Sequence, residues 1–373
     1  SVNIDSMGAI RMPTALGVAK MVLDPNNLEV IGHIEGSDPA LNIHLKKTAP
    51  PPAPTHEVQE VQIKSGDVSL YGHLHAPKYG DKKTAIIIVG GRGCYAGNTQ
   101  YDLNAKLLRA YGISVLICHK RGTGRSTGDC GTATVEDLAS DVIACQQFLQ
   151  NHPNAYESIG VMGSSAGGWV ITKALDRTDF DFMISIVGPS TSVRDQQKQS
   201  AQYGGKFYGL TDTAIQQVLA YTDLMFDAPA TEASFLQFQA MLKQAEASGW
   251  LELLDDTDVP STAAGIDSLW VRRHAFDPGK NLAAYSHPML VIYGEIDWIV
   301  PYRENIQRLE ELFAGERRQL LRTVIAYHAE HGTEVEGDYI KLDGGKSYWH
   351  FYRISPQVTV EIVNFLRKNK WIE

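Results

Sequence analysis

Short apolar runs separated by amphipathic stretches dominate the chain from His56 onward. Unbroken apolar runs are typical of strands buried on both faces of a parallel sheet, and they occur at residues 84–89, 113–118, 159–162, 182–187 and 289–293. Helical spacing falls at residues 102–111, 135–149, 168–175, 303–313 and 357–370. This alternation predicts an open, mostly parallel sheet with helices on both faces.

Three shorter stretches complete the expected sheet. Residues 58–63 and 68–75 alternate in polarity around a turn at Gly66, which predicts two antiparallel strands. Residues 339–342 are predicted as the last short strand, followed by the closing amphipathic helix.

The first 48 residues have a different pattern from the rest. Alternation at residues 28–35 and 41–45 predicts two or three short strands, too few for an independent core, that pack on the main body as a β-rich flap. Residues 49–55 contain Ala49-Pro-Pro-Pro-Ala-Pro54, the composition of a stiff linker. The main body is then expected in two parts, 56–189 and 284–373.

Between the two parts, residues 190–283 interrupt the strand pattern and predict a helical cap. Residues 213–226 and 231–248 have helical spacing and carry several aromatic and methionine side chains. These side chains are expected to form the core of the cap; the alternative is that some line an acyl or aromatic substrate pocket. They are Tyr221, Met225, Phe226, Phe235, Phe238 and Met241.

Composition and charge narrow the range of partners. The 373 residues are 43% hydrophobic and 21% charged, which is ordinary for a soluble globular protein. A net charge of -9 argues against nucleic acids and anionic membranes as partners. The sequence contains no apolar run of about 18 residues, so no transmembrane helix is predicted. No signal peptide is evident in the sequence. Because the chain begins at Ser1, a leader that has been removed stays an alternative. The compartment (cytoplasm, or periplasm and exterior) and the oligomeric state are left open.

The four cysteines match neither a metal-site spacing nor a disulfide framework. Cys118 and Cys145 lie in predicted core elements and are expected to be buried thiols. Cys94 and Cys130 both fall in loops after neighbouring strands, so a disulfide between them is left open.

The segment Gly163-Ser164-Ser165-Ala166-Gly167 carries the strongest chemical signal. It places G-x-S-x-G between a predicted strand and a predicted helix, the context in which such a serine is exposed at a strained turn. Ser165 is therefore the predicted nucleophile, and the N–H of Ala166 a predicted oxyanion donor. The alternative is a glycine-rich turn with an incidental serine.

A serine nucleophile needs a base and an acid, expected beyond the carboxyl ends of later strands. Asp297 follows the run at 289–293 and is preferred to the competing acid Glu295. His350, in the loop before the closing helix, is the predicted base and is preferred to His331. His328 and His331 form an H-x-x-H pair, but no further ligand at metal spacing accompanies them, so no metal is predicted.

The second oxyanion donor is expected in the glycine-rich loop after residue 89. Arg92 is the preferred N–H donor and Gly93 the second choice; a turn without a donor role is the alternative. The Arg92 side chain either binds a substrate carboxylate or points to solvent. Cys94 and Tyr95 follow in the same loop and are expected to contact substrate.

Residues 120–129 are rich in glycine and basic side chains and superficially match a phosphate-binding loop. The spacing departs from both the P-loop and the dinucleotide fingerprint, so a structural loop is predicted.

These segments together resemble the α/β-hydrolase fold, and within it bacterial serine esterases related to the prolyl-oligopeptidase and serine-aminopeptidase groups. The order Ser165, Asp297, His350 is the order of triads in that fold. The resemblance runs from about residue 57 to the end and rests on residues 91–93, 121–129, 163–167, 277–278 and 294–301. It implies a helical insertion after the sixth strand and a small N-terminal β-rich segment.

By this resemblance the activity is hydrolysis of small-molecule carboxylic esters through an acyl-enzyme, with no metal or organic cofactor. A peptidase or amidase of the serine-aminopeptidase type, an acyltransferase, and a non-catalytic binding module on the same scaffold are the alternatives.

Overall fold

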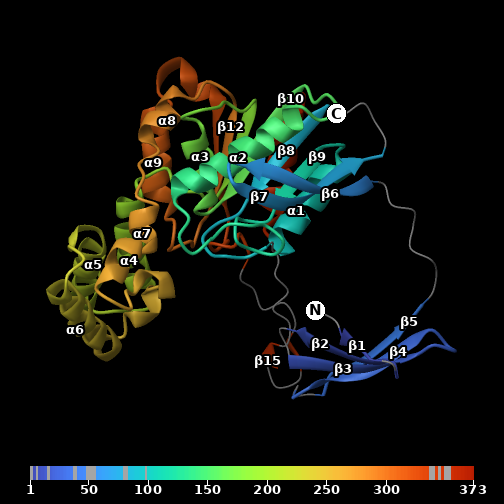
Figure 1. Cartoon of the computed structure of the whole chain (residues 1–373), viewed down its shortest axis with the longest axis horizontal. Coiled ribbons are helices and arrows are strands. Elements are labelled where there is room, and N and C mark those ends of the chain that lie inside the picture. The colour runs from blue at the N-terminus through green and yellow to red at the C-terminus, as the bar shows by residue number, and fades with distance from the viewer. Residues whose placement is uncertain are drawn as a thin grey trace. The chain divides into compact units, whose positions relative to one another are not determined.

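The computed structural model describes residues 3–5, 7–14, 17–36, 40–47, 56–78, 83–96, 99–335, 341–342, 346–347 and 354–373. The chain divides into two compact units, Ser1–Pro54 and Thr55–Glu373 (Figure 1).

The first unit is an antiparallel sheet of five strands in sequential order. The strands are β1 (Asn3–Ile4), β2 (Ala9–Thr14), β3 (Gly17–Asp24), β4 (Glu29–Glu35) and β5 (Asn42–Lys46). Ile10, Ala19, Met21 and Ile34 form a small buried cluster of their own. The expectation of two or three strands without a core was therefore wrong, because the strands at residues 3–24 alternate too weakly to be recognised.

The second unit is built on an eight-stranded sheet in the order β13-β12-β11-β10-β8-β9-β7-β6. The strands from β8 to β13 run parallel, whereas β7 pairs antiparallel with β9 and with β6. They are β6 (His56–Ser65), β7 (Val68–Pro77), β8 (Thr84–Val89), β9 (Ser114–Cys118), β10 (Ser158–Ser164), β11 (Phe182–Ile186), β12 (Met289–Gly294) and β13 (Leu321–Ala326). The predicted mostly parallel sheet is confirmed.

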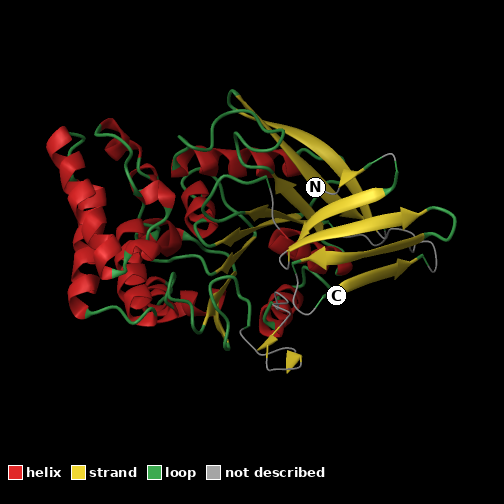
Figure 2. Ribbon diagram, turned by 90° about the horizontal axis from the view of Figure 1, so that it is seen from below, coloured by secondary structure: helices red, strands yellow, loops and turns green. Residues whose placement is uncertain are grey.

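Helices cover both faces of this sheet (Figure 2). One face packs on α1 (Thr99–Ala110) and α10 (Pro356–Lys368) through Leu108 and Phe365. The other packs on α2, α3, α8 and α9, which are Val135–Gln150, Gly167–Ala174, Gly279–Ala284 and Tyr302–Leu312. Strands buried on both faces are mostly apolar, and in β8 and β11 every residue except Thr84 and Ser185 is apolar. Within the described ranges, no helix has the length and apolarity to cross a membrane.

The helical cap lies between β11 and β12 in the sequence. It contains α4 (Val193–Phe207), α5 (Asp212–Asp227), α6 (Glu232–Ser248) and α7 (Trp270–Arg273), with short 3-10 turns η1 (Leu251–Leu253), η2 (Asp256–Asp258) and η3 (Ala264–Ser268). Figure 1 shows α4, α5, α6 and α7 gathered at one end of the second unit.

The aromatic and methionine side chains of the cap form its own core, as expected. Tyr221, Met225 and Phe238 are buried there together with Trp250, and Phe226, Phe235 and Met241 pack against them. Tyr221 also donates its hydroxyl to the carbonyl of Asp258 at 2.9 Å.

The last strand of the main sheet differs from the prediction. It is β13, whereas β14 (Lys341–Leu342) belongs to a separate two-stranded ladder with β15 (Lys346–Ser347). Strand β13 lies at the edge of the sheet, where buried, intermediate and exposed positions are mixed and Arg322 pairs with Glu361. A half-exposed edge strand lacks the continuous apolar signal of the interior strands.

Candidate active site

Ser165 lies at a sharp turn between β10 and α3. Its φ of 51° is in the left-handed region, which is unusual for a residue with a side chain. Its N–H donates to the carbonyl of Ile186 at 2.9 Å, which ties the turn to the neighbouring strand. A Cβ on Gly163 would lie 2.6 Å from the carbonyl oxygen of Gly167, so glycine permits the close strand–helix approach. The strand–turn–helix context predicted for this serine is confirmed.

His331 is the histidine beside Ser165. Its Nε2 lies 2.9 Å from the Ser165 Oγ, and its Nδ1 lies 2.8 Å from the Asp297 Oδ2. With the Nδ1 proton donated to the carboxylate, Nε2 is free to accept the hydroxyl proton of Ser165. The three side chains therefore form one continuous hydrogen-bonded chain.

This geometry corrects the choice of His350 over His331. The position expected for His350 is taken by His331, which lies in the loop after β13; His350 itself falls outside the described residues. Once β13 is recognised as the last parallel strand, the loop beyond its carboxyl end contains His328 and His331. Residues 321–326 have neither an unbroken apolar run nor strict alternation, so no clear sequence signal marks this strand or the loop after it.

Asp297 is positioned in the tight turn that follows β12. Its Oδ1 accepts the N–H groups of Ile299 and Val300 at 2.8 and 2.9 Å, and its side chain is fully buried. These bonds leave Oδ2 directed at His331. Glu295, the competing acid, instead accepts the N–H of His328 at 2.9 Å.

The environment of His331 controls its proton affinity. Burial opposes protonation, but the negative charge of Asp297, its hydrogen bond and the nearby Glu330 outweigh burial and raise the His331 pKa above 6.5. A general base must be neutral to act.

We expect kcat/KM to fall as the pH drops through a midpoint above 6.5, because protonated His331 cannot accept the Ser165 proton. A pH–rate profile with a neutral nitrophenyl ester measures this midpoint. In Asp297→Asn the midpoint should move to lower pH because the charge that favours the protonated form is gone. An unmoved midpoint in that variant would contradict the assignment.

The loop after β8 comes close to the serine, as an oxyanion loop must. A Cβ on Gly91 would lie 3.0 Å from the Ser165 Cβ and 3.6 Å from its Oγ. Gly93 has a φ of 102°, which few other residues adopt. The backbone N–H groups of Ala166, Arg92 and Gly93 donate to no acceptor in the described part of the chain.

Lys120 holds this loop from the carboxyl end of β9. Its ammonium donates to the carbonyls of Gly91 and Gly93, the latter at 2.7 Å, and lies 4.5 Å from the centre of the Tyr95 ring. Burial lowers the Lys120 pKa to about 8. Tyr95, expected to contact substrate, thus supports the lysine that holds the loop.

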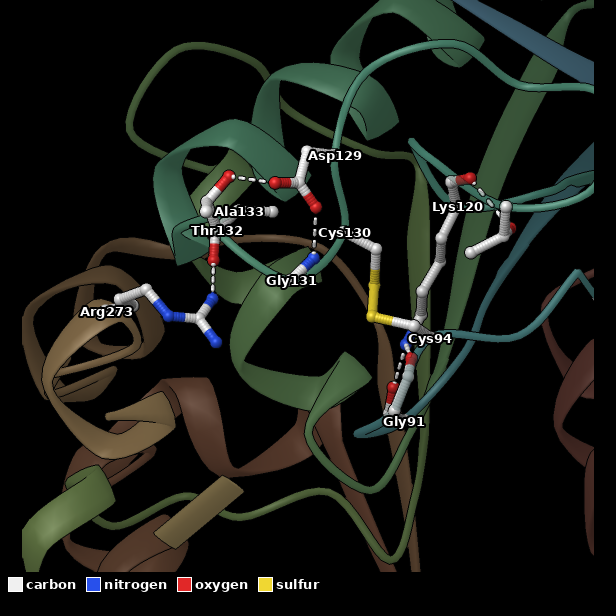
Figure 3. The surroundings of a disulfide bond; sticks show 11 residues. Gly91, Cys94, Lys120, Asp129, Cys130, Gly131, Thr132, Ala133 and Arg273 are labelled. Atoms are coloured by element: carbon white, nitrogen blue, oxygen red, sulfur yellow. Dashed lines mark hydrogen bonds between the residues drawn. A yellow bond between two sulfur atoms is a disulfide. The ribbon is translucent and has the colours of Figure 1, made fainter. Parts of the chain in front are cut away.

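A disulfide between Cys94 and Cys130 ties the same loop to the connection between β9 and α2 (Figure 3). The two Cα atoms are 5.7 Å apart, and the two cysteines are separated by 36 positions in the sequence. The pairing left open by the sequence is therefore present. Cys118 and Cys145 are free thiols, and only Cys145 is fully buried.

We expect loss of this disulfide to loosen the oxyanion loop. Cys94→Ala/Cys130→Ala should lower the free energy of unfolding by about 2–4 kcal/mol. It should also lower kcat roughly tenfold, because oxyanion donors work only when held in place. Denaturant unfolding and ester kinetics measure both effects. Cys118→Ala, which removes a free thiol, is the control; a double variant as stable and as fast as the parent would contradict this role.

The Arg92 side chain joins the loop to the cap. It pairs with Asp258 at 2.8 Å and Asp255 at 3.4 Å, donates to the Thr257 hydroxyl, and stacks 4.3 Å from the centre of the Trp270 ring. The side chain is 21% exposed and paired within the protein, so the expectation that it points to solvent is wrong, whereas the alternative of a substrate carboxylate contact stays a prediction. Sequence alone does not indicate its partners, because they lie more than 160 positions away.

Residues 120–129 form a structural loop, as predicted. Arg121 donates to the carboxylates of Asp137 and Asp141 at 2.9 and 2.8 Å, which fastens the loop to α2. Its guanidinium is thus occupied by protein carboxylates rather than directed toward a ligand.

The H-x-x-H pair does not form a metal site. His331 is engaged by Ser165 and Asp297, whereas His328 is 61% exposed at its side chain and packs on Tyr327. Over the described ranges, no cluster of three histidine, cysteine or acidic side chains could hold a metal ion.

This arrangement provides the groups that acyl transfer needs. A hydroxyl is hydrogen bonded to a base, the base to a buried carboxylate, and the backbone of Gly91 closely approaches the hydroxyl.

Several solved structures share this fold at low sequence identity. An esterase of Pyrococcus furiosus, Pf2001, superposes with a TM-score of 0.54 at 16% identity, over 87% of this chain and 96% of that chain. Est1E of Butyrivibrio proteoclasticus with bound ferulic acid gives 0.52 at 16% identity, over 83% and 98%. A proline iminopeptidase of Mycobacterium smegmatis gives 0.53 at 16% identity, over 83% and 98%.

At such identities these likenesses establish the fold alone. No curated protein matches the sequence. Residues 80–337 match the family described as serine aminopeptidase, S33. The match spans most of the chain and includes Ser165, Asp297 and His331; the protein is a member of this hydrolase family within the α/β-hydrolase superfamily.

Proposed function

We propose that the protein is a serine hydrolase that cleaves carboxylic esters through an acyl-enzyme formed on Ser165. The hydrogen-bonded chain from Ser165 through His331 to Asp297 carries this proposal. It supplies a nucleophile, a base and an orienting acid from three separate strand ends.

The reaction follows from the positions of these groups. The Ser165 Oγ attacks the ester carbonyl while its proton passes to the His331 Nε2, and the buried Asp297 stabilises the imidazolium. The N–H groups of Ala166 and Arg92 hold the oxyanion. The alcohol leaves with the proton from His331, and water, deprotonated by the same histidine, releases the acid.

The charged side chains around the cavity next to Ala166 and Arg92 favour esters over substrates with a free amine. Beside Ala166 and Arg92 the described cavity wall carries Lys120 and Arg273, and its acidic residue, Asp255, already contacts Arg92. An aminopeptidase would need unpaired carboxylates there to attract an ammonium group.

One observation favours a peptidase as the second candidate. Glu330 and Glu334 flank His331 in the chain and share a hydrogen bond; burial and this bond raise the Glu334 pKa to about 7. At pH 7 Glu334 is therefore about half protonated, which reduces the negative charge that attracts an amine.

The test compares a nitrophenyl butyrate ester with aminoacyl nitroanilides and with a fluorophosphonate probe. Ester hydrolysis and labelling at Ser165, with slower anilide turnover, support the proposal. Anilide turnover without ester turnover would establish the peptidase, butyrate transfer to an added alcohol in preference to water would establish an acyltransferase, and no labelling would indicate a non-catalytic protein.

A further inference from the structure

A cavity of about 190 Å³ opens beside the proposed oxyanion donors. Its wall contains Arg92 and Gly93 from the loop after β8, Ala166 from the elbow, and residues of α7 in the cap. The Cys94–Cys130 disulfide forms part of the same wall. Because Ala166 directly follows Ser165 and Gly91 approaches its Cβ, a group bound here would lie on the side of Ser165 that carries the proposed oxyanion donors.

The cavity wall carries three cationic side chains and one carboxylate, Asp255, while Asp129 outside the wall acts electrostatically on Arg273. Of its three cationic residues, Arg92 is paired with Asp255 and Asp258. Lys120 and Arg273 form no ion pair with an acidic side chain among the residues that the structure describes. Unpaired cations away from water are costly, so such a site favours an anionic ligand.

Arg273 is held in position by backbone carbonyls. Its Nε donates to Ser268 at 3.0 Å and its Nη1 to Ala133, whereas the other terminal nitrogen points away from Ala133 (Figure 3). A guanidinium fixed at two of its nitrogens keeps N–H donors for a planar anion at little further cost in entropy.

Part of the wall is aromatic and apolar. Trp270 stacks on His274 with ring centres 4.3 Å apart and planes inclined by 13°. Burial lowers the His274 pKa to about 4, so this ring is neutral at physiological pH. Leu138 and Val170 complete the apolar side. The cavity thus suits a small apolar group that ends in an anion.

We propose that this cavity binds a carboxylate of the substrate through Arg273 and Lys120, so that the preferred esters carry a free carboxylate on the acyl or the alcohol side. The inference rests on the proposed esterase function and specifies its substrate class.

Matched ester pairs test it. Nitrophenyl butyrate is compared with nitrophenyl hemiglutarate for the acyl side, and 4-(methoxycarbonyl)phenyl butyrate with 4-carboxyphenyl butyrate for the alcohol side. In one pair, kcat/KM of the parent should favour the anionic ester by about 10- to 100-fold, the value of a hydrogen bond to a charged group. This preference should decline above a pH of about 8 as Lys120 loses its proton.

Arg273→Gln should reduce the anionic-to-neutral ratio of kcat/KM toward one, whereas Arg273→Lys should retain part of it. A merely structural defect would lower both rates and leave the ratio as in the parent. Arg318→Gln is the matched control, because Arg318 pairs with Glu310 and lies outside the cavity wall. Inhibition of the parent by glutarate but not by glutaramide tests the site without any variant.

Equal kcat/KM values within both pairs, or an unchanged ratio in folded Arg273→Gln, would overturn this substrate class while leaving the esterase intact. If Arg273→Gln does not fold, equal inhibition by glutarate and glutaramide would overturn it. If the parent hydrolyses none of the four esters and Ser165 is not labelled, the proposed esterase function itself would be overturned.

Discussion

Ser165→Ala is expected to lower kcat for nitrophenyl butyrate by about 10⁴- to 10⁶-fold, the loss typical when a nucleophile is removed from a triad. The Ser165 Oγ is the atom bonded to the His331 Nε2, and it is the only hydroxyl oxygen that the described residues place there. Alanine leaves no atom to form the acyl-enzyme. Steady-state kinetics and fluorophosphonate labelling measure the loss.

Ser164→Ala is the matched control, since it removes a neighbouring hydroxyl that ends β10 and makes no described contact with His331. It should retain labelling and a rate within a few-fold of the parent. If Ser165→Ala keeps full activity while remaining folded, Ser165 is not the nucleophile.

His331→Ala is expected to cause a loss of similar size, about 10⁴- to 10⁶-fold in kcat. In the proposed mechanism the imidazole, whose Nε2 contacts the Ser165 Oγ, accepts the serine proton and later protonates the leaving alcohol. Asp297 would also lose its hydrogen-bond partner and stay buried with only its two backbone donors.

The decisive comparison is with His350→Ala, which changes the residue first expected from the sequence. That variant should keep activity near the parent level. The reverse result, an inactive His350→Ala and an active His331→Ala, would restore the sequence-based assignment. Circular dichroism of both variants separates a catalytic loss from a folding defect.

The preference for His350 as the base shows which kind of strand a sequence pattern fails to predict. Interior strands such as β8 and β12 are apolar at nearly every position because both faces are covered, and each was recognised. Strand β13 is an edge strand with exposed Arg322, so its pattern resembles a loop. Missing it shifted the expected last strand to residues 339–342 and the base to the loop beyond them.

The contacts around the oxyanion loop illustrate a second limit. The glycines of this loop indicated a close backbone approach, which Gly91 makes to Ser165. The carbonyl contacts of Lys120, the ion pair between Arg92 and Asp258 and the disulfide join segments far apart in the chain. Such pairings depend on how the cap and the connections after β9 pack against the loop after β8. No local sequence pattern predicts them.

The sequence by itself determined the α/β class, the helical cap and the elbow at Ser165. Each depends on local physics: apolar runs that must be buried, helical periodicity, and glycines that permit a strained turn. Only the tertiary structure decided that His331 meets Ser165 and that Arg92 pairs with the cap. These outcomes follow from strand order and long-range packing, which bring together side chains whose separation in sequence carries no information about their distance.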